Sequence, residues 1–111
     1  MERVRDLAAW NKAMTDKALG PKIIAYARKS ANEDLLKFLT LMRAGKKGQN
    51  EYDLFIKTRS KYEMNIDDDL RKKFDAVAAV KPKPDWSKAP WDKVTTEVIK
   101  MFNDNVASKV T

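Results

Sequence analysis

The sequence contains no cysteine and no histidine. Without cysteine, the chain can form neither disulfides nor thiolate metal sites. Without histidine, it lacks the commonest general base, the commonest metal ligand and the central residue of a Ser-His-Asp triad. We therefore expect no conventional hydrolase site and no metal centre built on thiolates.

Glycine and proline are also scarce, with three and four residues among 111. Frequent Ala, Leu, Lys, Asp and Glu favour helix over sheet, and no alternating apolar/polar run has the length of a strand. No apolar run is long enough to span a bilayer, and the mixed charges of the first ten residues are unlike a secretory signal. We predict one soluble helical domain over residues 1–111.

Acidic residues are fewer than basic ones, 16 against 23, so the formal net charge is +7. An excess of positive charge suggests an acidic protein face, an anionic lipid or a nucleic acid as partner. The basic clusters lie at residues 46–47, at 71–73 and at Lys81, Lys83 and Lys88, and we interpret them first as solvated faces. An anionic membrane surface is the next option. Nucleic acid is the least favoured of these partners, because the sequence shows no face on which aromatic residues alternate with basic ones for base stacking.

Apolar residues recur at helical spacing in six segments. The spacing predicts helices over residues 2–15, 21–29, 33–44, 49–57, 68–80 and 91–108. Pro21 suits a first turn, and Gly45 suits a C-cap. The third segment is apolar over most of its circumference, which is typical of a central helix; its apolar residues are Leu35, Leu36, Phe38, Leu39, Leu41 and Met42.

The aromatic residues at helical spacing are predicted to lie in the core, and they are Trp10, Phe38, Phe55, Phe74 and Phe102. Trp86 and Trp91 flank the end of a proline-punctuated loop, residues 81–90. They either cap the end of the bundle, which is the favoured interpretation, or present an exposed anchor.

The stretch YDLFIKTRSKYEMNIDDDLR, residues 52–71, contains the clearest candidate site. Asn65 lies in a connection between two helices, between Met64 and Ile66, which we expect to point inward. On spacing alone, a turn is favoured over a partner contact for Asn65. The aspartates at 67–69 lack the glycine and the terminal glutamate of a calcium loop. An aspartate just before Leu70 is a good helix N-cap, so we interpret these residues as capping.

Three blocks of the sequence, taken in order, resemble a known family. ANEDLLKFL, residues 31–39, is similar to a segment S-E-E-N-L-x-F-W, and residues 52–71 align without a gap to Y-x-x-F-I … x-N-[IL]-D-x-x-x-R. WDKVTTEVIKMFNDNVASKV, residues 91–110, is similar to F-D-x-A-Q-x-x-I-x-x-L-M-x-x-D-S-x-x-R-F. These segments are those of the RGS domain, the regulator of G-protein signalling. The resemblance covers most of the chain and implies a compact all-α bundle of about seven to nine short helices.

RGS domains bind the GTP-bound α subunit (Gα) of heterotrimeric G proteins and speed its GTP hydrolysis. They hold the switch loops in the shape of the transition state and contribute no nucleophile, metal or base. The resemblance thus implies a protein that is at most a GTPase-activating partner, without a cofactor. It also implies a cytoplasmic location, at the inner face of the plasma membrane if a membrane is bound. The family asparagine that braces the water-orienting glutamine of Gα corresponds to Asn65, which reverses the preference for a turn.

Other contact positions implied by the resemblance match the family less closely. The Glu-Asn pair of the family falls on Glu33 and Asp34, so the amide has become a carboxylate. Asp67 keeps the aspartate that follows the asparagine motif, and Met101 conservatively replaces an apolar contact residue of the last helix.

The end of the last helix departs most from the family pattern. The Asp-Ser pair of the family falls on Asn105 and Val106, and its arginine falls on Lys109, which lacks the donor fork of arginine. These positions are expected at the surface, so they leave the fold prediction intact but count against ordinary GTPase activation. The full Gα-binding set implied by the resemblance is Glu33, Asp34, Asn65, Asp67, Met101, Asn105, Val106 and Lys109.

Two alternatives stay open. The first is a non-catalytic scaffold that keeps the RGS fold and binds an acidic protein partner or an anionic membrane through its basic face. The second is a small basic nucleic-acid binder, which salt-dependent retention of DNA or RNA would support.

Overall fold

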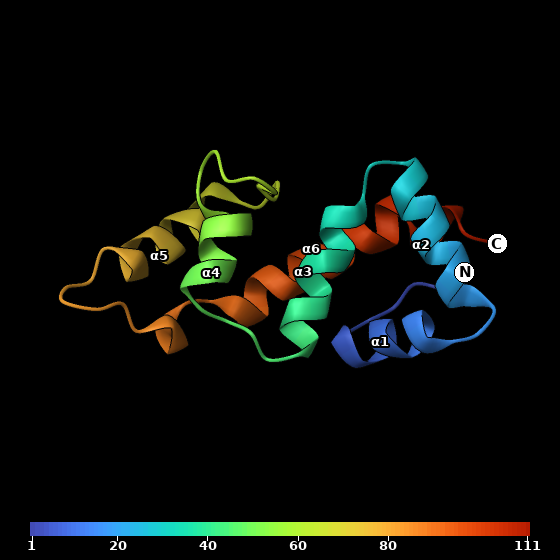
Figure 1. Ribbon diagram of the computed structural model, residues 1–111, viewed down its shortest axis with the longest axis horizontal. Coiled ribbons are helices and arrows are strands. Elements are labelled where there is room, and N and C mark those ends of the chain that lie inside the picture. The colour runs from blue at the N-terminus through green and yellow to red at the C-terminus, as the bar shows by residue number, and fades with distance from the viewer.

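The computed structural model describes residues 1–111 and is helical throughout, without a strand (Figure 1). The α-helices are α1 (Leu7–Thr15), α2 (Leu19–Lys29), α3 (Glu33–Arg43), α4 (Gln49–Glu51), α5 (Asp68–Ala78) and α6 (Trp91–Asn105). A π-helical turn, η1 (Tyr52–Ile56), continues α4, and two 3₁₀ turns are η2 (Trp86–Lys88) and η3 (Ala107–Lys109). The predicted all-α class is confirmed, although the six α-helices are slightly fewer than the seven to nine expected.

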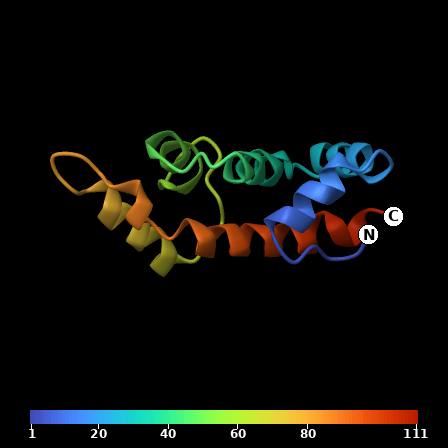
Figure 2. The ribbon, with the colours of Figure 1, turned by 90° about the horizontal axis from the view of Figure 1, so that it is seen from below.

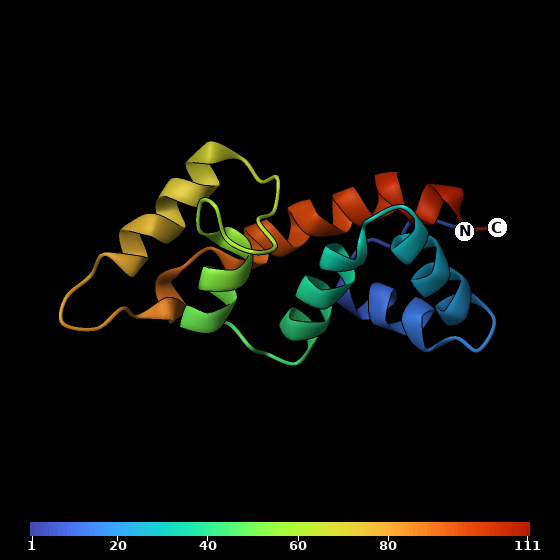
Figure 3. The same cartoon turned by 45° about the horizontal axis from the view of Figure 1, so that its top comes forward.

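The molecule is elongated, with extents of 48 × 23 × 19 Å. Helix α6 runs along its length and α3 lies against the middle of α6 (Figures 1 and 2). At one end lie α1, α2, η3 and both chain termini, which we call the terminal lobe (Figure 3). At the other end lie α4, η1, α5, η2 and their connections, which we call the loop lobe. Helices α3 and α6 join the two lobes.

Helix α3 is central, as its sequence predicts. It packs on α1, α2 and α6, and Phe38 and Leu39 are completely buried. The Phe38 ring meets Phe55 of η1 edge to face, with centroids 5.4 Å apart. Phe38 therefore belongs to the part of the core that couples α3 to the loop lobe.

The first helix is shorter than predicted, because α1 begins at Leu7 rather than at residue 2. Asp6 caps it, accepting a hydrogen bond from the Ala9 N–H at 2.8 Å. The segment before α1 is not helical. Its backbone forms hydrogen bonds with a buried side-chain amide of α6 instead. The Val4 N–H donates to Asn103 Oδ1 at 2.8 Å, and Asn103 Nδ2 donates to the Val4 carbonyl at 2.7 Å. This long-range pairing replaces the helical hydrogen bonds that the local sequence favours.

Among the other helix boundaries that differ from the prediction, two have a local cause in capping or backbone geometry. Helix α2 begins at Leu19, two residues before the predicted start, because the Asp16 carboxylate accepts from the N–H groups of Ala18 and Leu19. Helix α6 ends at Asn105, because Val106 leaves the helical conformation, with φ −122° and ψ −60°. Helix α5 also ends earlier than predicted, at Ala78 rather than at residue 80.

The chain leaves α3 as predicted. Gly45 has a positive φ of 75°, and the Lys46 N–H donates to the Leu41 carbonyl at 2.9 Å. This is the left-handed cap that glycine favours. The chain leaves α2 in the same way through Ala31, a non-glycine residue with φ 60°.

The tryptophans cap the end of the loop lobe, which agrees with the favoured interpretation. Trp91 is buried, and its Nε1 donates to the Trp86 carbonyl at 2.9 Å. The Trp86 ring lies 4.9 Å from that of Tyr52, whose hydroxyl donates to Asp75 Oδ1 at 2.6 Å. Burial and this hydrogen bond raise the pKa of Tyr52 above its ordinary value. None of the helices has both the length and the hydropathy that a bilayer crossing needs.

Candidate functional site

Asn65 is exposed on the connection between η1 and α5. Its neighbours Met64 and Ile66 are both buried, so the prediction that they point inward is confirmed. The Asn65 side chain makes no hydrogen bond within the protein, and neither does its backbone. An amide with one donor group and one acceptor oxygen is therefore left available to a partner.

The backbone around Asn65 is fixed by the end of the preceding helix. The last carbonyls of a helix have no partner within the helix. Here the Leu54 carbonyl accepts from the Tyr62 N–H at 2.9 Å, and the Phe55 carbonyl accepts from the Met64 N–H at 2.8 Å. The connection is thus bonded to η1 although it contains no regular element, and Asn65 follows the second of these hydrogen bonds by one residue.

Arg71 completes this anchoring from α5. Its guanidinium donates to the Ile56 carbonyl and to the Met64 carbonyl, the latter at 2.7 Å, and lies 3.6 Å from the Glu63 carboxylate. The Arg71 side chain is only 11% exposed. The interpretation of residues 71–73 as a solvated basic cluster is therefore wrong at Arg71. Arginine suits this role because its planar fork can reach two carbonyls at once.

The aspartates after Asn65 cap α5, as predicted. Asp67 Oδ1 accepts from the Asp69 N–H at 3.0 Å. No group of three or more acidic residues in the chain could hold a metal ion. The Asp67 N–H also donates to Glu97 Oε2 on α6, at 3.4 Å. The carboxylate of Asp67 is exposed but already engaged at the start of α5.

The connection that carries Asn65 touches both central helices. On one side Lys37 Nζ of α3 donates to the Tyr62 hydroxyl at 3.4 Å, and on the other Glu97 of α6 accepts from Asp67. Helix α3 crosses α6 steeply, near the middle of α6 (Figures 1 and 3).

Two of the predicted contact residues lie one helical turn away from these anchors. Glu33 is four residues before Lys37, and Met101 is four residues after Glu97, so each shares a helix face with its anchor. We call the surface that is predicted to include Glu33, Asn65 and Met101 the Asn65 surface. Glu33 lies 3.7 Å from Arg28 across the start of α3; the Arg28 side chain is 68% exposed and that of Glu33 44%.

The structure corrects one predicted contact, Val106. Its side chain is completely buried, because the chain turns at this residue between α6 and η3 and inserts it into the core. Val106 cannot contact a partner in this structure. Asn105 and Lys109 are exposed as predicted, Asp34 is half-buried, and Met101 is partly buried against the core.

Arg71 is the positioning residue that the sequence analysis missed, although it stands at the last position of the 52–71 motif. Comparison of the chain with protein-family models, with curated proteins and with solved structures finds no match. The exposed position of Asn65 between two buried residues and the resemblance of three sequence blocks are therefore the grounds for a functional assignment.

Proposed function

We propose that this protein is an RGS-like regulator that binds the GTP-bound α subunit of a heterotrimeric G protein through the Asn65 surface. The observation that carries the proposal is the state of Asn65 itself. Its amide is exposed and has no partner, yet the backbone on either side is anchored by the buried Met64 and Ile66. A side chain presented on a fixed backbone loses little conformational freedom when it binds.

The chemistry expected of such an amide is positioning. Asn65 would donate and accept hydrogen bonds to the switch region of Gα and hold the water-orienting glutamine in the geometry of hydrolysis. This role needs no base or metal from the regulator, since the phosphoryl-transfer machinery belongs to Gα. Preorganised hydrogen bonds of this kind typically change rates by about 10²–10³-fold.

The substituted contacts make selective binding the expected behaviour. Asp34 adds a carboxylate at the start of α3, where the family has an amide. Lys109 is exposed and offers a point charge instead of a fork of donors. Val106 does not contribute to selectivity, because it is buried. We therefore expect binding to some Gα subunits and not to others.

The test is single-turnover GTP hydrolysis on a panel of Gα subunits, with binding to their GDP-bound and transition-state-mimic forms measured in parallel. Asn65→Ala should lower the acceleration by at least about tenfold. Its free energy of unfolding should change by less than about 0.5 kcal/mol, because Asn65 makes no internal hydrogen bond. Asn50→Ala is the matched control, since Asn50 is also exposed but lies on α4 outside the Asn65 surface.

Three outcomes are informative. Acceleration that Asn65→Ala abolishes and Asn50→Ala leaves intact would support the proposal. Binding to the transition-state mimic without acceleration would indicate sequestration of Gα. Strong acceleration that Asn65→Ala leaves unchanged would contradict the role of Asn65, and absence of binding to every subunit would remove the proposal.

A second candidate function, membrane attachment of a non-catalytic scaffold, is favoured by one feature of the loop lobe. Val80 is one of two large hydrophobic side chains that are well exposed, at 49%, and the exposed Lys81 and Lys83 follow it. An apolar side chain beside lysines is suited to an anionic lipid surface. Sedimentation with phosphatidylserine vesicles should then retain the protein at low salt, and Val80→Asp should abolish retention while Ala79→Asp, one position earlier and also exposed, lowers it less.

A further inference from the structure

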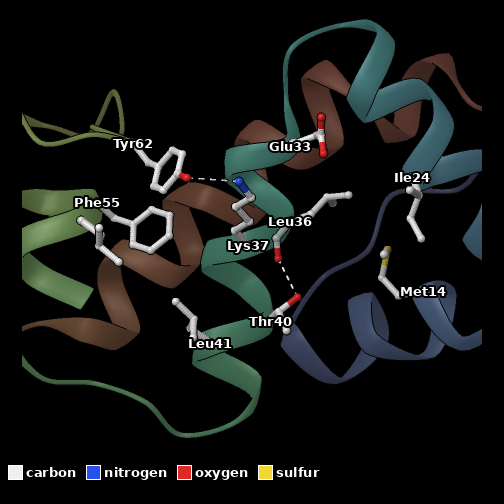
Figure 4. Close-up of a pocket in the computed structure, with 10 residues that line it drawn as sticks. Met14, Ile24, Glu33, Leu36, Lys37, Thr40, Leu41, Phe55 and Tyr62 are labelled. Atoms are coloured by element: carbon white, nitrogen blue, oxygen red, sulfur yellow. Dashed lines mark hydrogen bonds between the residues drawn. The ribbon is translucent and has the colours of Figure 1, made fainter. Parts of the chain in front are cut away.

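We propose that the groove across α3 binds an anionic amphiphile, with its acidic head group at Lys37 and Lys61 and its alkyl chain over the apolar floor of the groove (Figure 4). The inference does not depend on the proposed G-protein partner, because it rests on the shape and charge of the groove itself, which shares Glu33 with the Asn65 surface.

The groove has the size and composition of a ligand site. Its volume is about 490 Å³, within the range of roughly 300–1,000 Å³ that small-molecule sites occupy. It lies between the two lobes, with α3 as its floor and side chains of α1, α2 and η1 along its edges (Figure 4). Seven of its ten residues are hydrophobic, and the full set is Met14, Ile24, Glu33, Leu36, Lys37, Thr40, Leu41, Leu54, Phe55 and Tyr62.

The floor of the groove is more apolar than its sequence implies. Leu36, Thr40 and Leu41 lie at helical spacing on α3, and the Thr40 hydroxyl donates to the Leu36 carbonyl at 2.7 Å. The hydroxyl is therefore satisfied inside the helix. Ile24, at the far edge, is 39% exposed and is the other well-exposed large hydrophobic side chain of the protein. Exposed apolar surface gathered in a groove is typical of a binding site.

The polar end of the groove is positively charged and lacks a counter-ion. Lys37 Nζ lies 4.4 Å above the centre of the Tyr62 ring, and Lys61 Nζ lies 5.2 Å from the same centre. Neither ammonium group forms a salt bridge. Lys37 Nζ donates to the Tyr62 hydroxyl at 3.4 Å, and Lys61 and then Lys37 lower the pKa of Tyr62 below its ordinary value. These groups can together receive one anionic head group.

The one carboxylate that lines the groove does not cancel this charge. Glu33 lies on the same face of α3 as Lys37, but its carboxylate is 3.7 Å from the Arg28 guanidinium. One end of the groove, beside Tyr62, is thus positively charged without a counter-ion, and the rest of the groove is apolar. This matches a ligand with one acidic head and one chain. An acidic amphipathic helix would instead present carboxylates along its length, where the groove has no free cations.

The contribution of the alkyl chain can be tested by titration calorimetry with octanoate, decanoate and dodecanoate, each below its critical micelle concentration. Burying a methylene contributes about 0.8 kcal/mol, so affinity should rise roughly fourfold for each methylene added until the groove is filled. Dodecanol tests the head group. It should bind roughly tenfold more weakly than dodecanoate at low salt, and added salt should narrow this difference.

Two sets of variants locate the site. The double variant Lys37→Gln/Lys61→Gln should reduce dodecanoate binding to the level of dodecanol, and Lys72→Gln/Lys73→Gln is the matched control with the same change of net charge. Leu41→Gln should weaken the binding of dodecanoate and of dodecanol equally, because it affects only the contacts with the alkyl chain. A bound carboxylate should also move the titration of Tyr62 to higher pH in the wild-type protein. Circular dichroism checks that each variant folds.

The proposal is overturned if dodecanoate and dodecanol bind equally, or if the two double-lysine variants lose the same affinity. It is also overturned if dodecanoate fails to bind while an acidic amphipathic peptide binds at the groove, because the occupant would then be a protein segment.

Discussion

The two lobes are held together by different kinds of interaction. In the terminal lobe, completely buried apolar side chains from α2, α6 and η3 pack together, namely Ile23, Ala27, Phe102, Val106 and Ala107. Its one buried polar tie is the pair that Asn103 makes with the Val4 backbone. In the loop lobe, eleven residues, 57–67, contain no helix. Their position depends on hydrogen bonds from Arg71 and from the backbone to the end of η1.

The difference explains why the candidate site lies where it does. Helices that pack on other helices have a regular backbone and cannot bend it to present one polar side chain outward. The connection in the loop lobe presents Asn65 outward and still has an ordered backbone, because buried side chains alternate with exposed ones over residues 64–66.

The largest effect should come from Phe38, which belongs to both lobes. Phe38→Ala removes a fully buried ring that packs on Phe55, and it should cost about 3–5 kcal/mol of unfolding free energy. Urea unfolding followed by circular dichroism and by tryptophan fluorescence should give coincident transitions, since Trp10 lies in the terminal lobe and Trp86 and Trp91 lie in the loop lobe. Phe38→Leu should cost less. A change near zero would mean that α3 does not couple the lobes.

Asn103→Ala should break the terminal lobe selectively. The change leaves the N–H and the carbonyl of Val4 without partners in a buried position. The free energy of unfolding should fall by about 1–3 kcal/mol for each unsatisfied group, and by less where water can replace the lost hydrogen bond. Hydrogen exchange at Val4 should accelerate, while exchange at Met64 stays slow. Asn105→Ala, two residues further along and exposed, is the control and should change stability by less than about 0.5 kcal/mol. Equal effects would contradict a structural role for the Asn103 amide.

Arg71→Met should break the loop lobe selectively. It keeps most of the apolar stem but removes the hydrogen bonds to the Ile56 and Met64 carbonyls, and a loss of about 1.5–3 kcal/mol is expected for bonds to a charged group. Hydrogen exchange should increase across residues 57–67 and leave α1 and α2 unchanged. Lys72→Met is the matched control, because Lys72 is exposed. If Gα binding is confirmed, Arg71→Met should also weaken it, because Asn65 is then less well positioned.

The smallest effects should come from the left-handed residues that follow the C-terminal ends of α2 and α3. Ala31 and Gly45 both have positive φ, at 60° and 75°. Ala31→Gly should therefore stabilise the protein and Gly45→Ala should destabilise it, each by about 1 kcal/mol. Chemical denaturation of the two single variants measures this directly. The same sign for both would show that neither position is governed by backbone strain.

Most of the fold could be predicted because its signals are local. The spacing of apolar residues located every helix, and the breadth of the apolar surface on residues 33–44 identified the central one. The error at residues 2–6 arose because a distant segment binds this part of the chain. No local pattern indicates that Val4 pairs with Asn103, 99 residues away.

The candidate site was likewise predictable from the sequence only where its signals are local. The outward position of Asn65 between two buried neighbours follows from the alternation of apolar and polar residues, and capping by Asp67 follows from its place before α5. The role of Arg71 could not be predicted from residues 71–73 alone, where three basic residues in succession suggest a solvated face. Whether a basic side chain is solvated depends on which carbonyls the fold leaves without partners nearby.

The sequence by itself determined the helical class, the central place of α3, the inward direction of Met64 and Ile66, and the net positive charge. These depend on composition and on spacings of a few residues, which the backbone geometry of a helix converts directly into faces. Only the tertiary structure decided that Arg71 anchors the Asn65 connection, that Val106 is buried, and that Lys37 and Lys61 lie uncompensated beside one apolar groove. Those features arise when segments distant in sequence meet, and the free energy of such contacts depends on partners that no local pattern contains.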